Sequence, residues 1–556
     1  MVARIARLLR REVSGLHAAA YILGGFALLS SVLALVRDRV LAHLFGAGSA
    51  LDAYYAAFKI PNLIFVGVAS LFSLYAIIPL LNNFKLEGEE VRRFLGGLMA
   101  SFGVLSIVVS VGGFFLLPFI AKILFPTILN GSYGTSFVLL GQILLLQPIL
   151  LGLSGIFASV TQTYGRFALY ALGPVLYNVG IVIGATFFYP VLGLIGLGWG
   201  VVLGASLHMG VQIPFLLKEG FLQVRHLRPA LTQFLSVSKL SLPRTIALSS
   251  HHGLLFVFIA LAALLSPGSV AVFSFAFNLQ AVPLAIIGMS YSVAAFPTLA
   301  RLYAKGDLAS LFQNLSTAIR HILFWSLPII FLGIVLRAHI VRVILGSGAF
   351  DWADTRLTAA AFALFLISLA AQGMVLLLSR ASYAMGLTKP PLIASAVGII
   401  VASCTVLTGL LILNRYPGLV LDIAFFLRAE GLSGAVLVLP AAYSVGVFAQ
   451  VCTLFFLLPK NPQRSSEGVS RLLAQSLFAG VLAGLTAYLT LQIVDPFIPL
   501  TTFSGVFLQG IIAGCTGLFL YVLTLVSIGN REIYAVWRTV RQRLRAEAVA
   551  AEDIDL

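Results

Sequence analysis

Long apolar runs separated by short polar stretches dominate this chain from His17 to Ile528. Each run has about twenty residues, which is enough for a helix to cross a hydrocarbon core about 30 Å thick. Because lipid offers no hydrogen-bond partner to a bare backbone, such runs predict helices rather than open strands. The pattern therefore predicts an all-α polytopic membrane protein with about fourteen transmembrane helices.

Hydropathy places these spans with boundaries uncertain by about four residues. The predicted spans are 16–38, 51–83, 93–121, 135–162, 166–189, 191–217, 230–265, 268–303, 308–337, 354–385, 388–414, 431–457, 469–492 and 501–527. The first span follows several arginines but ends at Arg37-Asp38 without a small-residue cleavage site. We therefore expect a retained first helix rather than a secretory signal.

The composition argues against a soluble protein. Charged residues make up 10% of the 556 positions and hydrophobic residues 60%, whereas soluble domains have about 25% charged residues. A net charge of +16 would suggest a nucleic-acid partner in a soluble protein, but here the basic residues lie in short loops between apolar spans. That distribution indicates orientation in a membrane and predicts no nucleic-acid partner.

The basic loops also predict which side of the membrane each terminus occupies. Segments 1–15, 218–229 and 528–556 contain clusters of basic residues, and alternation of the spans puts them on one side. By the positive-inside rule they are a cytoplasmic N-terminus, a cytoplasmic linker and a cytoplasmic tail. The tail after Asn530 is expected either to lie against anionic headgroups or to be solvated.

Two segments of the chain resemble each other at an offset of about 219 residues, as duplicated halves of transporters do. Ala57-Phe58-Lys59 corresponds to Ala276-Phe277-Asn278, and Tyr164-Gly165 corresponds to Tyr383-Ala384. Chance similarity between apolar segments is the alternative. The repeat predicts two pseudo-symmetric six-helix lobes, 16–217 and 230–457, followed by two C-terminal helices within 469–527.

Ionisable residues inside the spans are the candidate functional residues, because a charge at mid-membrane costs about 2.5–3.5 kcal/mol on insertion scales. The candidates are Arg37, Asp52, Lys59, Lys239 and Arg244. For Lys59 and Arg244 we favour a substrate-facing role over a structural ion pair or snorkelling. Arg37 next to Asp38 is equally compatible with a local ion pair, and Asp52 lies seven residues before Lys59 on the same predicted helical face.

Several classes of chemistry lack a basis in the sequence. There is no GxxxxGK[ST], HExxH or GxSxG motif, so ATP-driven transport, hydrolysis and any other enzyme activity are not predicted, and no cofactor is. His251 and His252 are adjacent and thus about 100° apart on a helix, which is poor geometry for one metal. The glycine stripe Gly196, Gly200 and Gly204 predicts close helix packing.

The sequence at the first two spans resembles a known family. Arg37-Asp38, Ala42 to Gly48 (AHLFGAG), Asp52 to Tyr55 and Ala57 to Asn62 closely resemble the first hairpin of the MurJ (MviN) lipid II flippases. Arg166-Phe167-Ala168 with Pro174 and Asn178, and the stretches Gly348–Asp351 and Asp354–Thr358, resemble later parts of the same family.

This resemblance implies a transporter of the multidrug/oligosaccharidyl-lipid/polysaccharide superfamily, located in the plasma (inner) membrane of a bacterium. Its two lobes are expected to enclose a cationic cavity, with two extra helices forming a groove for lipid. The implied substrate is lipid II, an undecaprenyl diphosphate carrying a disaccharide-pentapeptide, which is flipped to the outer leaflet for peptidoglycan synthesis. Implied partners are this lipid-linked diphosphate, membrane lipids and cell-wall synthesis proteins. Arg37 and Lys59 match basic cavity positions of the family, and Asp52 matches its acidic one.

The chain departs from the family pattern where several cations are expected, because Ser31, Phe65, Val66 and Asn278 stand at positions that carry arginine in the family. We hypothesise that Arg244 and Lys239, from the seventh predicted span, replace part of that charge. The same span has no carboxylate, so no sodium site is predicted.

Three other functions stay open from the sequence. A flippase for another polyprenyl-linked glycan would use the same cationic grip on a diphosphate. A multidrug exporter of the superfamily would carry organic cations and therefore need acidic cavity residues. A membrane scaffold that recruits cell-wall proteins would not depend on Lys59. For a flippase, we expect transport driven by the membrane potential, worth about 2.3 kcal/mol per charge per 100 mV.

Overall fold

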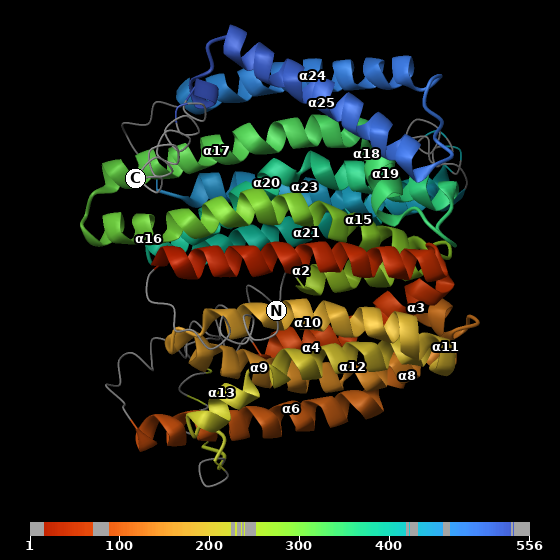
Figure 1. Ribbon diagram of the computed structural model, residues 1–556. Coiled ribbons are helices and arrows are strands. Elements are labelled where there is room, and N and C mark those ends of the chain that lie inside the picture. The colour runs from red at the N-terminus through yellow and green to blue at the C-terminus, as the bar shows by residue number, and fades with distance from the viewer. Residues whose placement is uncertain are drawn as a thin grey trace, which may run out of the picture. The chain divides into compact units, whose positions relative to one another are not determined.

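The structure is a computed structural model in which the described elements are helices joined by turns and loops (Figure 1). It describes residues 16–69, 88–223, 228–230, 235, 238, 252–416, 418, 422, 432–459, 467–534 and 538. The chain divides into two compact units. Unit 1 contains residues 1–275 and 344–354, and unit 2 contains residues 276–343 and 355–556.

Unit 1 is built from the helices of the first half of the chain. They are α2 (Leu16–Phe45), α3 (Ser49–Ala57), α4 (Lys59–Ala69), α6 (Glu89–Leu124), α7 (Pro126–Leu129), α8 (Gly134–Leu144), α9 (Leu146–Thr163), α10 (Phe167–Ile183), η2 (Gly184–Phe188), α11 (Tyr189–Leu192), α12 (Leu194–Gly210), α13 (Ile213–Lys218), the helix His252–Ala263 and the start of α15 (Ser269–Leu284). Helix α10 packs against α2 and α12, and α9 packs against α4, α6 and α12.

Unit 2 continues α15 and contains the rest of the helices. They are η4 (Ala285–Met289), α16 (Ser290–Ala304), α17 (Leu308–Val335), α18 (Arg337–Leu345), α19 (Trp352–Ile367), α20 (Leu369–Ala384), α21 (Lys389–Arg415), η5 (Leu432–Leu437), α23 (Val438–Leu457), α24 (Glu467–Val494) and α25 (Phe503–Ser527). Helices α18 and α19 cross the division, since 344–354 belongs to unit 1. Figure 1 shows the blue α24–α25 hairpin beside α17, and α24 packs against α17.

The prediction of an all-α polytopic membrane protein is confirmed. Within the part of the chain that the structure describes, 10 helices are long and apolar enough to cross a membrane, or 11 if the bent pair α19 and α20 is one span. Every predicted span overlaps a described helix or helix pair, and 230–265 does so only through His252–Ala263. Most of 230–251 lies outside the described residues, so the total of fourteen stays a prediction, as do the lobe boundaries.

The bend between α19 and α20 is explained by side chains at the point where the two helices meet. Helices α19 and α20 meet at Ser368 with an angle of 44°. The Ser368 hydroxyl donates to the Phe365 carbonyl at 3.0 Å and accepts a bond from Gln372 at 3.1 Å. A buried serine that bonds to the backbone of its own helix competes with the helical ladder and bends it.

The predicted glycine packing in α12 is confirmed. A Cβ atom on Gly200 would lie 2.4 Å from the Cα atom of Gly184, and one on Gly204 would lie 2.4 Å from the Tyr177 carbonyl oxygen. Backbones this close leave no room for a side chain, and Gly196 faces the Phe188 backbone at 2.5 Å in the same way. Small residues thus let α12 approach α10 and the π-helical turn η2 closely.

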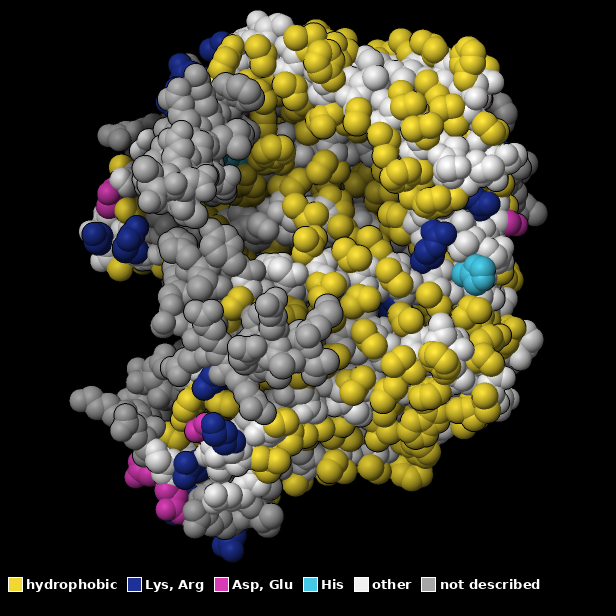
Figure 2. Space-filling view, viewed as in Figure 1, with side chains coloured by type: hydrophobic (Ala, Val, Ile, Leu, Met, Phe, Trp, Pro, Cys, Tyr) yellow, Lys and Arg dark blue, Asp and Glu magenta, His cyan; other side chains and the backbone are white. Residues whose placement is uncertain are grey.

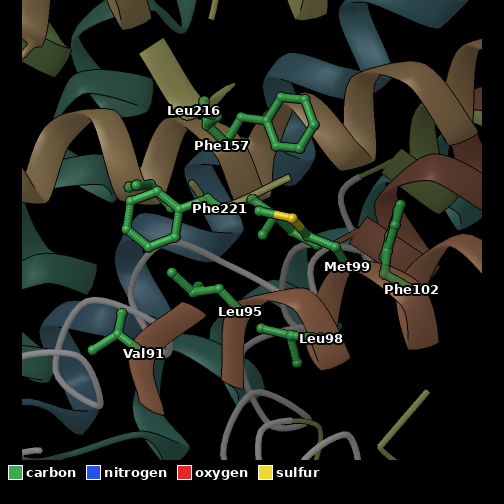
Figure 3. Close-up of a cluster of buried hydrophobic side chains, with 10 residues drawn as sticks. Val91, Leu95, Leu98, Met99, Phe102, Phe157, Leu216 and Phe221 are labelled. Carbon is green, nitrogen blue, oxygen red and sulfur yellow. The ribbon is translucent and has the colours of Figure 1, made fainter. Parts of the chain in front are cut away.

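Unit 1 also has an apolar core where α6, α9 and α13 meet (Figure 3). Leu95, Leu98 and Phe102 of α6 are fully buried there, and Phe157 and Leu216 pack against them. On the face of the molecule in Figure 2, hydrophobic side chains cover most of the described surface, while charged side chains gather toward the ends of the helices. An apolar belt between charged ends is typical of a protein that faces lipid.

Candidate functional site

Arg37 is held by two polar partners within unit 1. Its Nε and Nη2 atoms donate to one carboxylate oxygen of Asp38, at 2.9 and 2.7 Å, and its Nη1 atom donates to the Asn178 side-chain oxygen at 3.0 Å. The Arg37 side chain is 19% exposed and the Asp38 side chain 3%. The local ion pair that the sequence allowed is therefore present, and Arg37 also links α2 to α10.

The side chain of Asn178, which accepts the hydrogen bond from Arg37, is itself held in place by hydrogen bonds. Its amide nitrogen donates to the Pro174 carbonyl at 3.1 Å and lies 3.4 Å from the Ser30 hydroxyl. Since the amide donates to these groups, the side-chain oxygen points toward Arg37. Pro174 lies in α10 one turn before Asn178, so this bond holds the amide against its own helix. Asn178 is buried and thus acts as a rigid acceptor for Arg37.

Three tyrosines are close enough to the guanidinium group to interact with it electrostatically. Tyr54, Tyr55 and Tyr177 all interact electrostatically with Arg37. Tyr54 packs edge-on against Tyr55, with ring centroids 5.4 Å apart. The Tyr55 hydroxyl is buried and has no hydrogen-bond partner among the described residues. Arg37 therefore has tyrosines among its neighbours, and the hydroxyl of Tyr55 keeps an unused hydrogen bond.

Asp52 makes contacts that the sequence did not indicate. Its carboxylate accepts hydrogen bonds from the backbone amides of Gly268, at 2.6 Å, and Ala271, at 2.8 Å. These amides belong to the first turn of α15 and the residue before it, where helical N–H groups have no helical acceptor. Asp52 is buried. Its carboxylate caps α15, and its negative charge is stabilised by the positive end of that helix dipole. It does not pair with Lys59.

Lys59 begins α4, directly after Phe58 interrupts the helical run. Among the described residues it makes no hydrogen bond or ion pair, and it interacts electrostatically with His252. The side chain is half-buried. A half-buried ammonium without a carboxylate partner is costly in a membrane, so Lys59 stays a candidate functional residue.

The remaining candidates and departures from the family pattern are placed as follows. Lys239 and Arg244 lie outside the described residues. The Ser31 hydroxyl donates to the Ala27 carbonyl of its own helix at 3.0 Å. Phe65, Val66 and Asn278 are half-buried. Arg37, Asp52 and Lys59 all belong to unit 1.

The segment 344–354, from later in the chain, also belongs to unit 1 and contacts the loop before α3. The Asp354 carboxylate accepts a bond from the Ala47 amide at 2.9 Å, and the Ala349 amide donates to the His43 carbonyl at 2.9 Å. Gly46 has a φ of +60°, and a Cβ atom there would lie 2.7 Å from the Ala349 carbonyl oxygen. The two segments that resemble the known family, AHLFGAG and 348–354, are therefore held against each other.

Metal chemistry finds no support within the described ranges. No group of three or more His, Cys, Asp or Glu side chains there could hold a metal ion. His208 instead shares its Nδ1 atom with the Ser154 hydroxyl at 2.7 Å, and Gln212 donates to the same hydroxyl at 2.7 Å. That histidine is part of the packing between α9 and α12.

Comparison with known sequences gives one family. A family model described as "Lipid II flippase MurJ" matches residues 41–508. A "Lipid II flippase MurJ" of Burkholderia cenocepacia is 27% identical over 395 residues, which covers 68% of this chain and 75% of that protein. A "Probable lipid II flippase MurJ" of Thermotoga maritima is 28% identical over 390 residues, with the same two shares of coverage.

Comparison with solved structures agrees on the fold. A structure titled "Lipid II flippase MurJ, inward closed conformation" matches with a TM-score of 0.69 and 21% identity, covering 91% of this chain and 99% of that one. An inward-facing multidrug resistance MATE transporter of the MOP superfamily matches with a TM-score of 0.60 and 13% identity, covering 80% and 95%. At these identities the likeness concerns the fold alone.

Proposed function

The chain belongs to the MurJ family of lipid II flippases, and from this we propose that it moves lipid II from the cytoplasmic to the outer leaflet for cell-wall synthesis. The observation that carries the proposal is the family match over residues 41–508. On this proposal the protein is a multi-pass transporter of the bacterial inner membrane with both termini in the cytoplasm. It alters no covalent bond of its substrate.

The charge of unit 1 supports an anionic passenger. A diphosphate has a large desolvation cost in lipid, and fixed cations replace the water that it loses. Lys59 suits this role because no described carboxylate neutralises it. Organic cations, the substrates of a multidrug exporter, would meet repulsion at the same place.

Arg37 supports the same role by a different geometry. A guanidinium group has five N–H donors in a fixed plane, and Asp38 and Asn178 take three of them. The two that remain can bind a phosphate oxygen, while the Asn178 contact keeps the plane in place. Since the charge of Arg37 is already balanced by Asp38, Lys59 contributes the greater net attraction. Lys239 and Arg244 are proposed to add the cations that Phe65, Val66 and Asn278 do not supply.

Alternating access requires a contact that forms in one conformation and breaks in the other, and we propose the contact between Asp52 and α15 for this role. The polyprenyl tail stays in the bilayer while the headgroup crosses through the protein. The Asp52 carboxylate, which caps α15, is proposed to stabilise the conformation described above. Returning the empty, cationic site to the inside is favoured by a negative interior, by about 2.3 kcal/mol per charge per 100 mV. No nucleotide is needed.

Complementation tests the proposal. A bacterium depleted of its lipid II flippase would express this chain, and lipid II in the outer leaflet would be measured. We expect rescue by the parent chain, loss of rescue with Lys59→Ala, and partial rescue with Lys59→Arg. A chain that inserts normally but fails to rescue, while it restores export of another polyprenyl-linked glycan, would replace lipid II as the substrate. Rescue that is unchanged by collapse of the membrane potential would contradict the proposed coupling.

A further inference from the structure

A charged cluster in unit 2 ties the C-terminal end of α25 to α17. Arg320 and His321 share the carboxylate of Glu532, with the Arg320 Nε atom 3.1 Å from Oε1 and the His321 Nε2 atom 3.2 Å from Oε2. Glu532 is buried, and its amide is capped by the side chain of Asn530 at 2.9 Å. One carboxylate therefore faces an arginine and a histidine together.

Helix α24 brings a further arginine to this cluster. A Cβ atom on Gly468 would lie 3.4 Å from the Arg320 Nη1 atom, and Gln475 accepts a hydrogen bond from Asn530 at 2.8 Å. Positions 468, 471 and 475 share one face of a helix, since they are three and four residues apart. Arg471 thus lies between two contacts that join α24 to the cluster, and it is exposed.

Arg531 adds a third arginine from the residues that follow α25. It follows Asn530 directly and is exposed. Neither Arg471 nor Arg531 has a carboxylate partner among the described residues. Arg320, Arg471 and Arg531 therefore carry more positive charge than Glu532 can balance.

The sequence of α17 favours a place for the cluster near the lipid headgroups. Helix α17 has 28 residues and is about 42 Å long, which exceeds a hydrocarbon core of about 30 Å. Its first turns carry the polar residues Gln313, Asn314 and Thr317, whereas the helix after His321 is apolar except for Ser326. Arg320 and His321 mark that change, which favours a position near the end of the hydrocarbon, from which a long side chain reaches the headgroups.

We propose that Arg320, Arg471 and Arg531 form a binding site for the phosphate of an anionic phospholipid headgroup, at the junction of α17, α24 and the end of α25. Glu532 orients Arg320 through its ion pair, and the two exposed arginines supply the net attraction. General attraction of basic loops to the cytoplasmic leaflet explains orientation but would give no preference for these positions over other exposed cations. A specific site predicts that losing these arginines weakens lipid binding more than losing other exposed cations does. The proposal does not depend on the transported substrate.

The test compares two double variants of the full chain in detergent. Arg471→Gln with Arg531→Gln removes the two exposed charges and leaves the Glu532 ion pairs intact. The matched control is Arg301→Gln with Lys305→Gln, which removes two exposed cations of the same unit. These two residues precede α17, which begins at Leu308. Leu308 is about 18 Å from Arg320 along the helix axis, so the control lies away from the proposed site. Phosphatidylglycerol is titrated, and bound lipid is counted by native mass spectrometry alongside the rise in melting temperature.

We expect the site variant to weaken phosphatidylglycerol binding about 25-fold, or about five-fold per arginine, while the control variant changes it less than about two-fold. Phosphatidylcholine should bind both weakly. Inorganic phosphate added at the same concentration should not displace the lipid, because the acyl chains contribute to binding. Equal losses in the two variants would overturn the proposal in favour of diffuse attraction. Displacement by inorganic phosphate would make the ligand a soluble anion instead.

Discussion

The carboxylate of Asp52 accepts a 2.8 Å hydrogen bond from the amide of Ala271, 219 residues further along the chain. The same offset separates Ala57-Phe58-Lys59 from Ala276-Phe277-Asn278. In the repeat predicted from the sequence, which stays a prediction, Asp52 and Ala271 occupy equivalent positions of the two copies. The contact itself is not symmetric, because α3 supplies the carboxylate and the start of α15 supplies the amides.

This asymmetry makes Asp52 a stability determinant. Asp52→Ala would leave the buried amides of Gly268 and Ala271 without an acceptor, at about 1–3 kcal/mol each. We expect a clear fall in the melting temperature of the purified protein. Asp52→Asn keeps one acceptor oxygen and should fall by less. An alanine variant as stable as the parent chain would show that these hydrogen bonds contribute nothing.

Asn178 provides a second test, this time of positioning. Asn178→Ala removes the acceptor of the Arg37 Nη1 atom, a hydrogen bond to a charged group worth about 1.5–3 kcal/mol. We expect reduced lipid II transport together with a modest loss of thermal stability. Ser30→Ala, the control, removes only the longer 3.4 Å contact to Asn178 and should leave both quantities near those of the parent. If Asn178→Ala transports normally, the orientation of Arg37 is unimportant.

Hydropathy predicted most of this architecture because span length is a local property of the sequence. The predicted span 51–83 illustrates its limit, since the run divides into α3 and α4 at Phe58. The candidate site was harder to predict. Arg37 and Asp38 are adjacent, so their ion pair could be anticipated, whereas the partners of Asp52 are backbone amides, which carry no signature in a sequence. The interaction of His252 with Lys59 likewise depends on tertiary packing.

Lys59 should separate transport from stability. Lys59 has no carboxylate partner among the residues that the structure describes, and such an ammonium in a membrane is destabilising. Lys59→Met, which keeps most of the length of the side chain, is therefore expected to retain or raise the melting temperature. The same variant should abolish lipid II transport, because the net attraction for the diphosphate is lost. Both are measured on one preparation, by thermal unfolding and by transport in vesicles. A variant that loses stability and transport together would assign Lys59 to the structure instead.

Glu532 predicts a pH dependence for the anchoring of the C-terminal hairpin. Its hydrogen bond with His321, helped by the charge of Arg320, lowers the Glu532 pKa below its ordinary value of 4.5. A carboxyl group with a depressed pKa contributes stability above its unfolded pKa, and that contribution is lost as the pH falls through the folded value. We expect the melting-temperature difference between the parent chain and Glu532→Gln to shrink as the pH falls below about 4.5. A difference that persists in acid would mean that ionisation of Glu532 is irrelevant. Because the side chains of its partners Arg320 and His321 are each 33% exposed, solvent screens the pairs and the effect should be small.

The close approach of α10 and α12 gives the sharpest contrast between two glycines. A Cβ atom on Gly180 would lie 2.2 Å from the Cα atom of Gly204, so the two helix backbones themselves would have to separate. Overpacking of this kind costs about 1–3 kcal/mol, and Gly180→Ala should lower the melting temperature. A Cβ atom on Gly155, within α9, would meet nothing within 4 Å. Gly155→Ala should therefore be neutral or stabilising by about 0.5–1 kcal/mol, because alanine loses less backbone entropy in a helix. If both substitutions had the same effect on the melting temperature, helix propensity rather than backbone contact would explain Gly180. The close packing of α10 and α12 would then not be what holds α10 in place against α2, where Arg37 lies.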